Sequence, residues 1–248
     1  MIASIFINQN VFKIDFSKPI DISIPIRAGS DNVNAFNIPP VRYEPLIAGK
    51  FIGDVNRGGP CNVFSISINP HGNGTHTETV GHISSEKFPI YNYLNRFFFE
   101  AQLISISPEK HNDDKIITRN QLEKLLKDKC KEALVIRTLP NSKEKINMHY
   151  SGTNPSYMES SAAAYLRELS VKHLLLDLPS IDKEEDNGKL LAHHVFWNYP
   201  DSPRTDCTIS ELAFIPDSVP DGIYLLNLQI ASFDNDASPS KPVLYAMF

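Results

Sequence analysis

The chain has few of the features that assign a protein to a specialised class. Its three cysteines, Cys61, Cys130 and Cys207, lie far apart and form no Cys-x-x-Cys pair, which disfavours a disulfide framework or a thiolate zinc knuckle. No apolar run reaches the roughly 18 residues that a membrane helix needs. The apolar start at Ile2–Ile7 is too short for a signal peptide and follows no basic residues. We therefore expect a soluble protein of the reducing cytoplasm, without a membrane partner.

An excess of positive charge is also missing. The chain has 24 Lys and Arg residues against 29 Asp and Glu residues, a net charge of −5 and no basic run. Binding to nucleic-acid phosphates needs clustered Lys and Arg, so we expect a small-molecule substrate and no nucleic-acid partner. The length of 248 residues and the hydrophobic content of 42% suit one globular domain over residues 1–248.

Short β-rich runs dominate the amino-terminal part. Ile2–Ile7 and Val11–Phe16 are predicted to pair as strands, and Ile20–Ile26 is predicted to form a third strand. Glycine and proline recur through residues 27–62, which predicts a long loop of the kind that often covers a functional site. Apolar and polar residues alternate at 64–68, which predicts another strand.

The rest of the chain mixes helices with strands. A short helix is predicted near residues 90–97, and capping boxes at Thr118 with Gln121 and at Ser156 with Glu159 each predict the start of a helix. Strands are predicted at Ala101–Ile106, Ala133–Thr138, Leu174–Leu178, Ile223–Ile230 and Val243–Met247, the last two joined by a polar loop at 232–241. The strand, helix, strand order around the second capping box predicts a parallel βαβ unit and an α/β fold.

The most informative segment is HGNGTHTETVGH at residues 71–82, where three histidines and one glutamate fall within twelve positions. If the chain is extended after Gly74, alternate side chains point the same way, which puts His76 and Glu78 on one side, roughly 7 Å apart along the strand. One cation can accept both side chains. The cluster therefore predicts a metal site.

The glycines in this segment predict a tight turn. Gly72 and Gly74 can take positive φ without steric cost, which would bring His71 back toward the same cation. Imidazole nitrogens combined with a carboxylate favour zinc, manganese or iron over magnesium or calcium.

A second group of candidate ligands follows the strand at 174–178. Asp177 and Asp182 end that strand, and the pair His193-His194 begins an apolar run after a charged loop. Glu211 lies among apolar residues, where a carboxylate is costly to bury unless it is paired or bound to metal. The alternative for Glu211 is an acid in the first turn of a helix, where the dipole favours negative charge.

These residues carry a resemblance to a known family. Gly74-Thr75-His76-x-Glu78-x-x-x-His82 resembles the signature His-x-Gly-Thr-His-x-Asp-x-Pro-x-His of the putative cyclase family, which includes bacterial kynurenine formamidases. Further segments that resemble the family in order are Asp21-Ile-Ser, Leu134-Val-Ile-Arg137-Thr138, Asp177-x-Pro179-Ser180-x-Asp182, His193-His194-Val-Phe-Trp and Ile209-Ser-Glu211-Leu. The resemblance extends over most of the chain from about Asp21.

The resemblance implies a centre with one or two divalent cations, zinc being favoured and manganese an alternative. His76 would ligate the first ion, and Glu78, where the family has Asp, would ligate or bridge. His193 and Glu211 would complete a second metal position. His82 would be the catalytic acid and base.

Two ligand positions leave alternatives. The first histidine of the family signature falls at Gly72, so His71 would need a one-residue bulge to act as a ligand. His194 is the alternative to His193, which we prefer because the apolar run begins two residues later, as in the family.

The family also implies a fold and a reaction. We expect a single α/β domain with a mixed, barrel-like β-sheet flanked by a few helices, of the swivelling β/β/α kind, and self-association as a homodimer or homotetramer. The expected activity is metal-dependent hydrolysis of a small amide, formamide or cyclic carbonyl compound by activated water. The alternatives are a metal-binding protein without turnover and a lyase or dehydratase that uses the same Lewis-acid site.

Aromatic residues of the expected long loop have two interpretations. Phe36, Tyr43 and Phe51 either cover an aryl substrate or belong to the core, and with 14 Phe and 9 Tyr in the chain the core interpretation is favoured.

Overall fold

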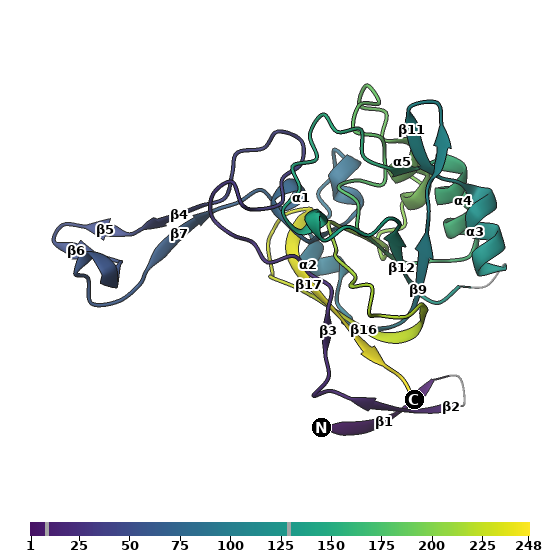
Figure 1. Ribbon diagram of the computed structural model, residues 1–248, viewed down its shortest axis with the longest axis horizontal. Helices are drawn as coiled ribbons and strands as arrows, with labels where there is room; N and C mark the ends of the chain where they lie inside the picture. The colour runs from purple at the N-terminus through teal and green to yellow at the C-terminus, as the bar shows by residue number, and fades with distance from the viewer. Residues whose placement is uncertain (8–9, 128–129) are drawn as a thin grey trace.

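The computed structural model describes residues 1–7, 10–127 and 130–248, and its centre is a closed β-barrel (Figure 1). In order around the barrel, its seven strands are β16 (Gly222–Ile230), β9 (Phe98–Ile106), β12 (Ala133–Thr138), β14 (His173–Leu176), β15 (Thr208–Glu211), β8 (His76–Glu78) and β17 (Ala237–Ala246). Pairing of β17 with β16 closes the ring. The expected α/β fold with a barrel-like sheet is confirmed.

The barrel sheet is mixed. Strands β9, β12, β14 and β15 run parallel to one another, whereas β8 is antiparallel to both β15 and β17. Helix α4 (Ser160–Glu168) connects β12 to β14, which confirms the predicted βαβ unit, and α5 (Leu191–Trp197) lies between β14 and β15. Because β14 and β15 run parallel, their carboxyl ends, near Leu176 and Glu211, lie at one edge of the barrel.

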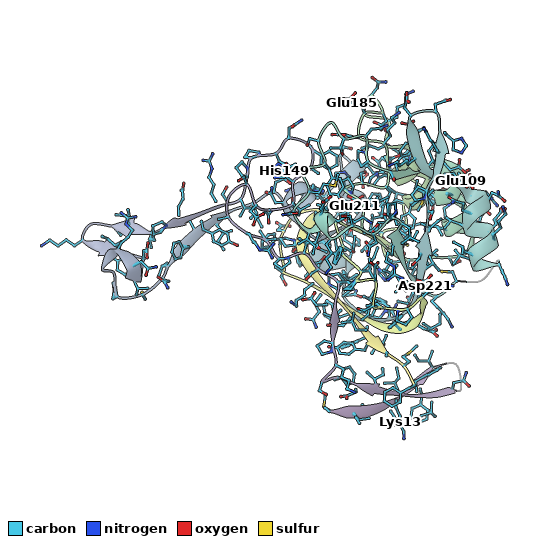
Figure 2. The ribbon with its side chains drawn as sticks, viewed as in Figure 1. Lys13, Glu109, His149, Glu185, Glu211 and Asp221 are labelled. Atoms are coloured by element: carbon cyan, nitrogen blue, oxygen red, sulfur yellow. The ribbon has the colours of Figure 1, made fainter. Side chains whose placement is uncertain are left out.

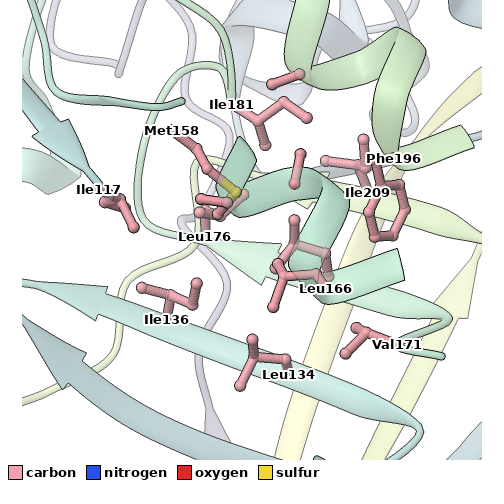
Figure 3. Packing of buried hydrophobic residues seen from close by; sticks show 14 of the residues in the cluster. Ile117, Leu134, Ile136, Met158, Leu166, Val171, Leu176, Ile181, Phe196 and Ile209 are labelled. Carbon is pink, nitrogen blue, oxygen red and sulfur yellow. The ribbon is translucent and has the colours of Figure 1, made fainter. Parts of the chain in front are cut away.

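Two hydrophobic clusters lie on opposite faces of the parallel strands. Leu134, Ile136 and Leu176 pack outward against Leu166 of α4 and Phe196 of α5 (Figure 3). Residues at the alternate positions of β12 and β14 instead join strands β9, β16 and β17 in the second cluster, inside the barrel. The interior of a barrel this small is filled by side chains, so a site can form at an edge of the barrel or on its outer face.

A two-stranded arm projects from the body of the molecule (Figure 1). It pairs β4 (Arg42–Pro45) with β7 (Phe64–Ser67) and, nearer the tip, β5 (Ile47–Ala48) with β6 (Phe51–Ile52), followed by the short helix η1 (Val55–Arg57). The predicted loop over 27–62 is therefore wrong within the arm. The arm has no buried face, so its first strand, β4, shows no alternation of apolar and polar residues. Strand β7 was predicted from its alternating residues, although all four of them are exposed.

The amino-terminal hairpin is confirmed, but the third predicted strand is shorter than expected. Strand β1 (Ile2–Ile7) pairs with β2 (Asn10–Asp15), and β3 covers only Ile20–Asp21 beside β17. The backbone leaves the sheet there, because the Ile24 N–H donates to Thr75 Oγ1 at 2.8 Å instead of to a neighbouring strand.

One capping box is confirmed and the other is wrong. Thr118 and Gln121 cap α3 (Arg119–Leu126) reciprocally. Ser156 instead precedes β13 (Tyr157–Met158), and α4 has Glu159 at its N-cap without a side-chain cap bond. The Glu159 carboxylate accepts a hydrogen bond from the Arg119 backbone N–H at 2.7 Å, so a contact with another helix replaces the local cap.

The remaining elements are short. Helix α2 (Ile90–Tyr93) ends before the predicted limit at residue 97, and strands β10 (Glu109–His111) and β11 (Asp114–Ile117) form a small sheet with β13, while η3 covers Lys143–Ile146. Over residues 1–7, 10–127 and 130–248, no helix combines the length and hydrophobicity that crossing a bilayer requires. The three cysteines are free.

Candidate metal centre

Strand β8 forms the base of the site, between β15 and β17. The register places His76 beside Glu211 of β15 and places Glu78 beside Ala237 of β17. Because side chains alternate along a strand, His76 and Glu78 point the same way, as predicted, and both are fully buried. His76 Nε2 lies 3.9 Å from Glu78 Oε2 and 3.5 Å from Glu211 Oε2.

His71 reaches the same point from a single helical turn, α1 (Pro70–Asn73). Its Nδ1 lies 3.0 Å from Glu78 Oε2. The predicted glycine turn is wrong, because Gly74 has an extended backbone with φ of 163° and Gly72 belongs to the helical turn. Both glycines serve close packing instead: a Cβ would lie 2.1 Å from the Ile38 side chain at Gly72 and 2.8 Å from the Ile26 side chain at Gly74.

His82 and His193 complete a ring of imidazoles around Glu78. His82 lies on η2 (Val80–Ile83), with Nδ1 3.6 Å from Glu78 Oε2. His193 lies on α5, with Nε2 3.1 Å from Glu78 Oε1 and 3.7 Å from Glu211 Oε1. His194 points elsewhere, with Nδ1 3.2 Å from the Tyr199 carbonyl. The structure thus brings His193, the preferred member of the pair, to the site.

Two neighbouring acids have separate tasks. Glu211 ends strand β15, so the alternative placement at a helix start is wrong, and its Oε1 accepts a hydrogen bond from the Ile181 N–H at 2.9 Å. Asp182 directly follows Ile181. Its carboxylate accepts hydrogen bonds from the backbone N–H groups of Ala192 and His193, and it lies 2.6 Å from His193 Nδ1. Asp182 therefore anchors the start of α5 and orients its histidine.

One acid at the site was missed by sequence reasoning. Asp236 Oδ2 lies 3.0 Å from His71 Nε2 and 3.6 Å from His82 Nδ1. It falls within the predicted polar loop at 232–241, but β17 begins at Ala237, and the Thr79 N–H donates to the Asp236 carbonyl at 3.0 Å. Only the pairing of β17 with β8 places this acid here, and no local pattern reveals that long-range register.

The residues at this point fit a divalent cation. Among the residues that the structure describes, the buried side-chain polar atoms without a hydrogen-bond partner are His76 Nε2, Glu78 Oε2 and Ser240 Oγ. Buried polar groups are nearly always satisfied, and two of these three face each other at the centre. An imidazole nitrogen and a carboxylate oxygen are ligands that zinc and manganese accept.

The donors divide into overlapping sets. Ligand atoms that lie within 4.8 Å of one another form three groups: His71, His76 and Glu78; Glu78, His82 and His193; and His71, His82 and Asp236. Glu78 belongs to the first two groups, so it is the residue that these two sets of donors share.

The carboxylates hold positive charge at the centre. Burial opposes the charged form of His71, but the carboxylates of Asp236 and Glu78, each 3.0 Å from a ring nitrogen, raise its pKa to about 10. Burial opposes it at His193 too, where Asp182 and Glu78 raise the pKa to about 10. Burial would raise the pKa of Glu78, but the surrounding histidines hold it well below its usual value. Because a metal ligand must be a neutral imidazole, cation binding at His71 and His193 would be coupled to proton release.

A pocket of about 480 Å³ opens onto the centre, bounded by His71, His82 and Glu211 and by the loop at 183–188. Figure 2 shows Glu211 within the body of the molecule and Glu185 at its edge. Of the three loop aromatics, Phe36 lines this pocket, whereas Tyr43 and Phe51 lie on the arm. A larger groove of about 770 Å³ lies beneath the amino-terminal hairpin, away from the histidines.

Comparison with known proteins identifies similar sequences. The family model described as "Putative cyclase" matches residues 16–183. The kynurenine formamidase of Bacillus anthracis is 26% identical over 230 residues, which cover 92% of this chain and 97% of that protein. The kynurenine formamidase of Bacillus mycoides (strain KBAB4) is 25% identical over 233 residues, or 93% and 96% of the two chains.

Solved structures share the fold. A protein from Bacillus stearothermophilus described as a predicted metal-dependent hydrolase superposes with a TM-score of 0.65 at 18% identity, covering 92% of this chain and 98% of that one. An isatin hydrolase bound to the product analogue thioisatinate gives a TM-score of 0.68 at 14% identity, covering 92% of each chain.

Proposed function

This chain belongs to the putative cyclase family, whose model matches more than half of it, and we propose that it is a metal-dependent hydrolase of a small amide, formamide or cyclic carbonyl compound. One observation carries the proposal: His76 Nε2 and Glu78 Oε2, two buried atoms for which the described residues supply no well-aligned hydrogen bond, lie 3.9 Å apart in a ring of imidazoles that opens onto a pocket. The full-length similarity to proteins named kynurenine formamidase supports the reaction class.

The proposed ligands follow the donor groups. His71, His76 and Glu78 would hold one cation, and Glu78 with His193 and Glu211 would hold a second, with zinc favoured over manganese. When bound, a divalent cation supplies a Lewis acid that polarises the substrate carbonyl and makes water acidic enough to give a nucleophile near neutral pH. Asp182 and the Gly74 carbonyl contact the outer nitrogens of His193 and His76 and so fix the direction of each ring.

His82 is the proposed acid and base. Its side chain is 27% exposed and lines the pocket, whereas His76 and His193 are buried. From this position it would accept the proton of the attacking water and donate it to the departing nitrogen. A ring that faces both the carboxylates and the pocket is suited to move a proton between them.

The pocket suits a small molecule. Its volume of about 480 Å³ lies in the usual range for small-molecule sites, and Phe36 and Leu190 give it apolar walls. An aryl formamide is therefore the first substrate to test. The formamide of kynurenine, which would place the protein in tryptophan catabolism, heads that series because of the relatives' names.

The test combines metal analysis with a substrate panel. Purified protein is assayed on formamides, lactones and cyclic imides, before and after treatment with a chelator and after Zn²⁺ or Mn²⁺ is added back. We expect at least one formamide or cyclic amide to be hydrolysed, with loss on chelation and recovery with the ion. Bound metal without turnover of any compound would favour a binding protein, and elimination without water uptake would favour a lyase.

A further inference from the structure

His71 is the one imidazole of the centre that departs from the family signature, and it contacts a carboxylate at each ring nitrogen. Nδ1 lies 3.0 Å from Glu78 Oε2, and Nε2 lies 3.0 Å from Asp236 Oδ2. The signature would place a histidine at position 72, where this chain has glycine. Because His71 is one residue before the signature position, another residue of this chain must orient its ring toward the centre.

The other imidazoles of the centre show how a neighbouring acceptor orients a ring. His193 contacts Asp182 through Nδ1 at 2.6 Å and faces Glu78 with Nε2, and His76 contacts the Gly74 carbonyl through Nδ1 at 3.1 Å. A neutral imidazole has one N–H donor. An acceptor on the outer nitrogen takes that N–H and leaves the inner nitrogen with a free lone pair for a cation.

We propose that Asp236 is the positioning residue that makes the displaced His71 a metal ligand. Its carboxylate contacts the nitrogen that faces away from Glu78, as the Asp182 carboxylate does for His193. The backbone holds Asp236 in place, because its carbonyl accepts from the Thr79 N–H at 3.0 Å and the next residue pairs with Glu78.

His71 needs such a partner more than the buried histidines do. Its side chain is 23% exposed, against 0% for His76 and 1% for His193, so packing encloses its ring less completely. Without the Asp236 carboxylate, the ring can present N–H toward the cation or rotate toward solvent. Both changes would remove a ligand.

The experiment measures metal affinity, so that it does not depend on turnover. The dissociation constant for Zn²⁺ is determined by competition with a chromogenic chelator for the wild type, Asp236→Asn and Asp236→Ala, each also in a His71→Ala background. Loss of an outer partner of a metal ligand weakens binding roughly 10- to 100-fold, and we expect this loss in both Asp236 variants. In the His71→Ala background, we expect a further change of no more than about twofold.

The matched control is Asp234→Asn, an exposed acid two residues earlier on the same loop, which should bind Zn²⁺ as the wild type does. Unchanged affinity in the Asp236 variants would overturn the inference, as would an equal loss with and without His71, since Asp236 would then act independently of that ring. The inference rests on the proposed metal centre. A wild type that binds no Zn²⁺ refutes the proposed function, whereas tight binding that is insensitive to Asp236 refutes only this inference.

Discussion

The candidate metal centre buries polar side chains, whereas the projecting arm exposes apolar ones. At the centre, the polar residues His76, Glu78 and His193 are at most 1% exposed, whereas on the arm the apolar residues Ile47 and Ile66 are 57% and 59% exposed. Burial of polar groups is costly unless they are paired or bound to metal, and the centre has the partners that reduce this cost. A two-stranded ribbon gives its apolar side chains no second layer to pack against.

This difference indicates which substitutions should affect metal content and activity. The centre depends on a few atoms held in one geometry, so single changes there should remove metal or activity. The arm contributes no atom to the centre or its pocket lining, so changes there should leave both intact. Four substitutions or conditions test this contrast, in decreasing order of expected effect.

His76→Ala should have the largest effect. The ring is fully buried, and its Nε2 accepts or donates no hydrogen bond within the part of the chain that the structure describes. We expect loss of both bound metal and turnover, measured by elemental analysis and by hydrolysis of the best formamide. A variant that retains wild-type metal content would show that His76 is not a ligand.

His82→Ala should separate chemistry from binding. Loss of a general acid and base typically lowers turnover by roughly 10²- to 10⁴-fold, and we expect a decrease of that size with metal content preserved. Elemental analysis of both variants gives the comparison. Equal metal loss in His76→Ala and His82→Ala would contradict this division of roles.

The pH dependence of the free energy of unfolding should reveal the raised pKa values of His71 and His193. Against burial, carboxylates raise the pKa of His71 and of His193 from 6.5 to about 10 in the folded, metal-free protein. A raised histidine pKa contributes stability that is present below the unfolded pKa and is lost as pH rises through the folded value. The free energy of unfolding of chelator-treated protein should therefore fall between about pH 7 and pH 10.

The control for this measurement is His71→Ala, whose stability should fall less steeply over the same pH range, because one of the two titrating rings is gone. Zn²⁺-saturated wild type should keep a nearly constant stability over this range, because ligation has already released the protons and the unfolded histidines are neutral above about pH 7. Urea unfolding at a series of pH values measures all three, and identical slopes for the wild type and His71→Ala would contradict the assignment.

Ile66→Ser on the arm should have the smallest effect. Because this side chain is 59% exposed, we expect the free energy of unfolding to change by no more than about 0.5 kcal/mol, with metal content unchanged. The buried Leu134→Ala should cost about 2–5 kcal/mol. Urea unfolding at several protein concentrations makes the comparison. A loss in Ile66→Ser that grows with concentration would show that a second copy of the chain covers the arm.

The fold was predictable from sequence where local signals act alone. The Thr118 and Gln121 capping box and the run Ala133–Thr138 were predicted correctly, because both depend on neighbouring residues. Ser156 has the same local pattern, but the contact between Glu159 and Arg119 of α3 overrides it. Of the arm strands, β7 was predicted, whereas β4, β5 and β6 were missed because none of their residues is buried.

The site was predictable to the same extent. His76 and Glu78 follow from the two-residue period of a strand, and His193 and Glu211 were indicated by the later segments that resemble the family. The helical turn that presents His71 and the register that brings Asp236 beside it depend on contacts between distant segments. A single sequence without a known register cannot supply these long-range pairings.

The most direct test of the central claim is a crystal structure of the purified protein with anomalous diffraction collected at the zinc and manganese absorption edges. We predict an anomalous peak within coordination distance of His76 Nε2 and Glu78 Oε2. Ordered density for these side chains without any anomalous peak among them, in protein crystallised with the ions supplied, would contradict the account.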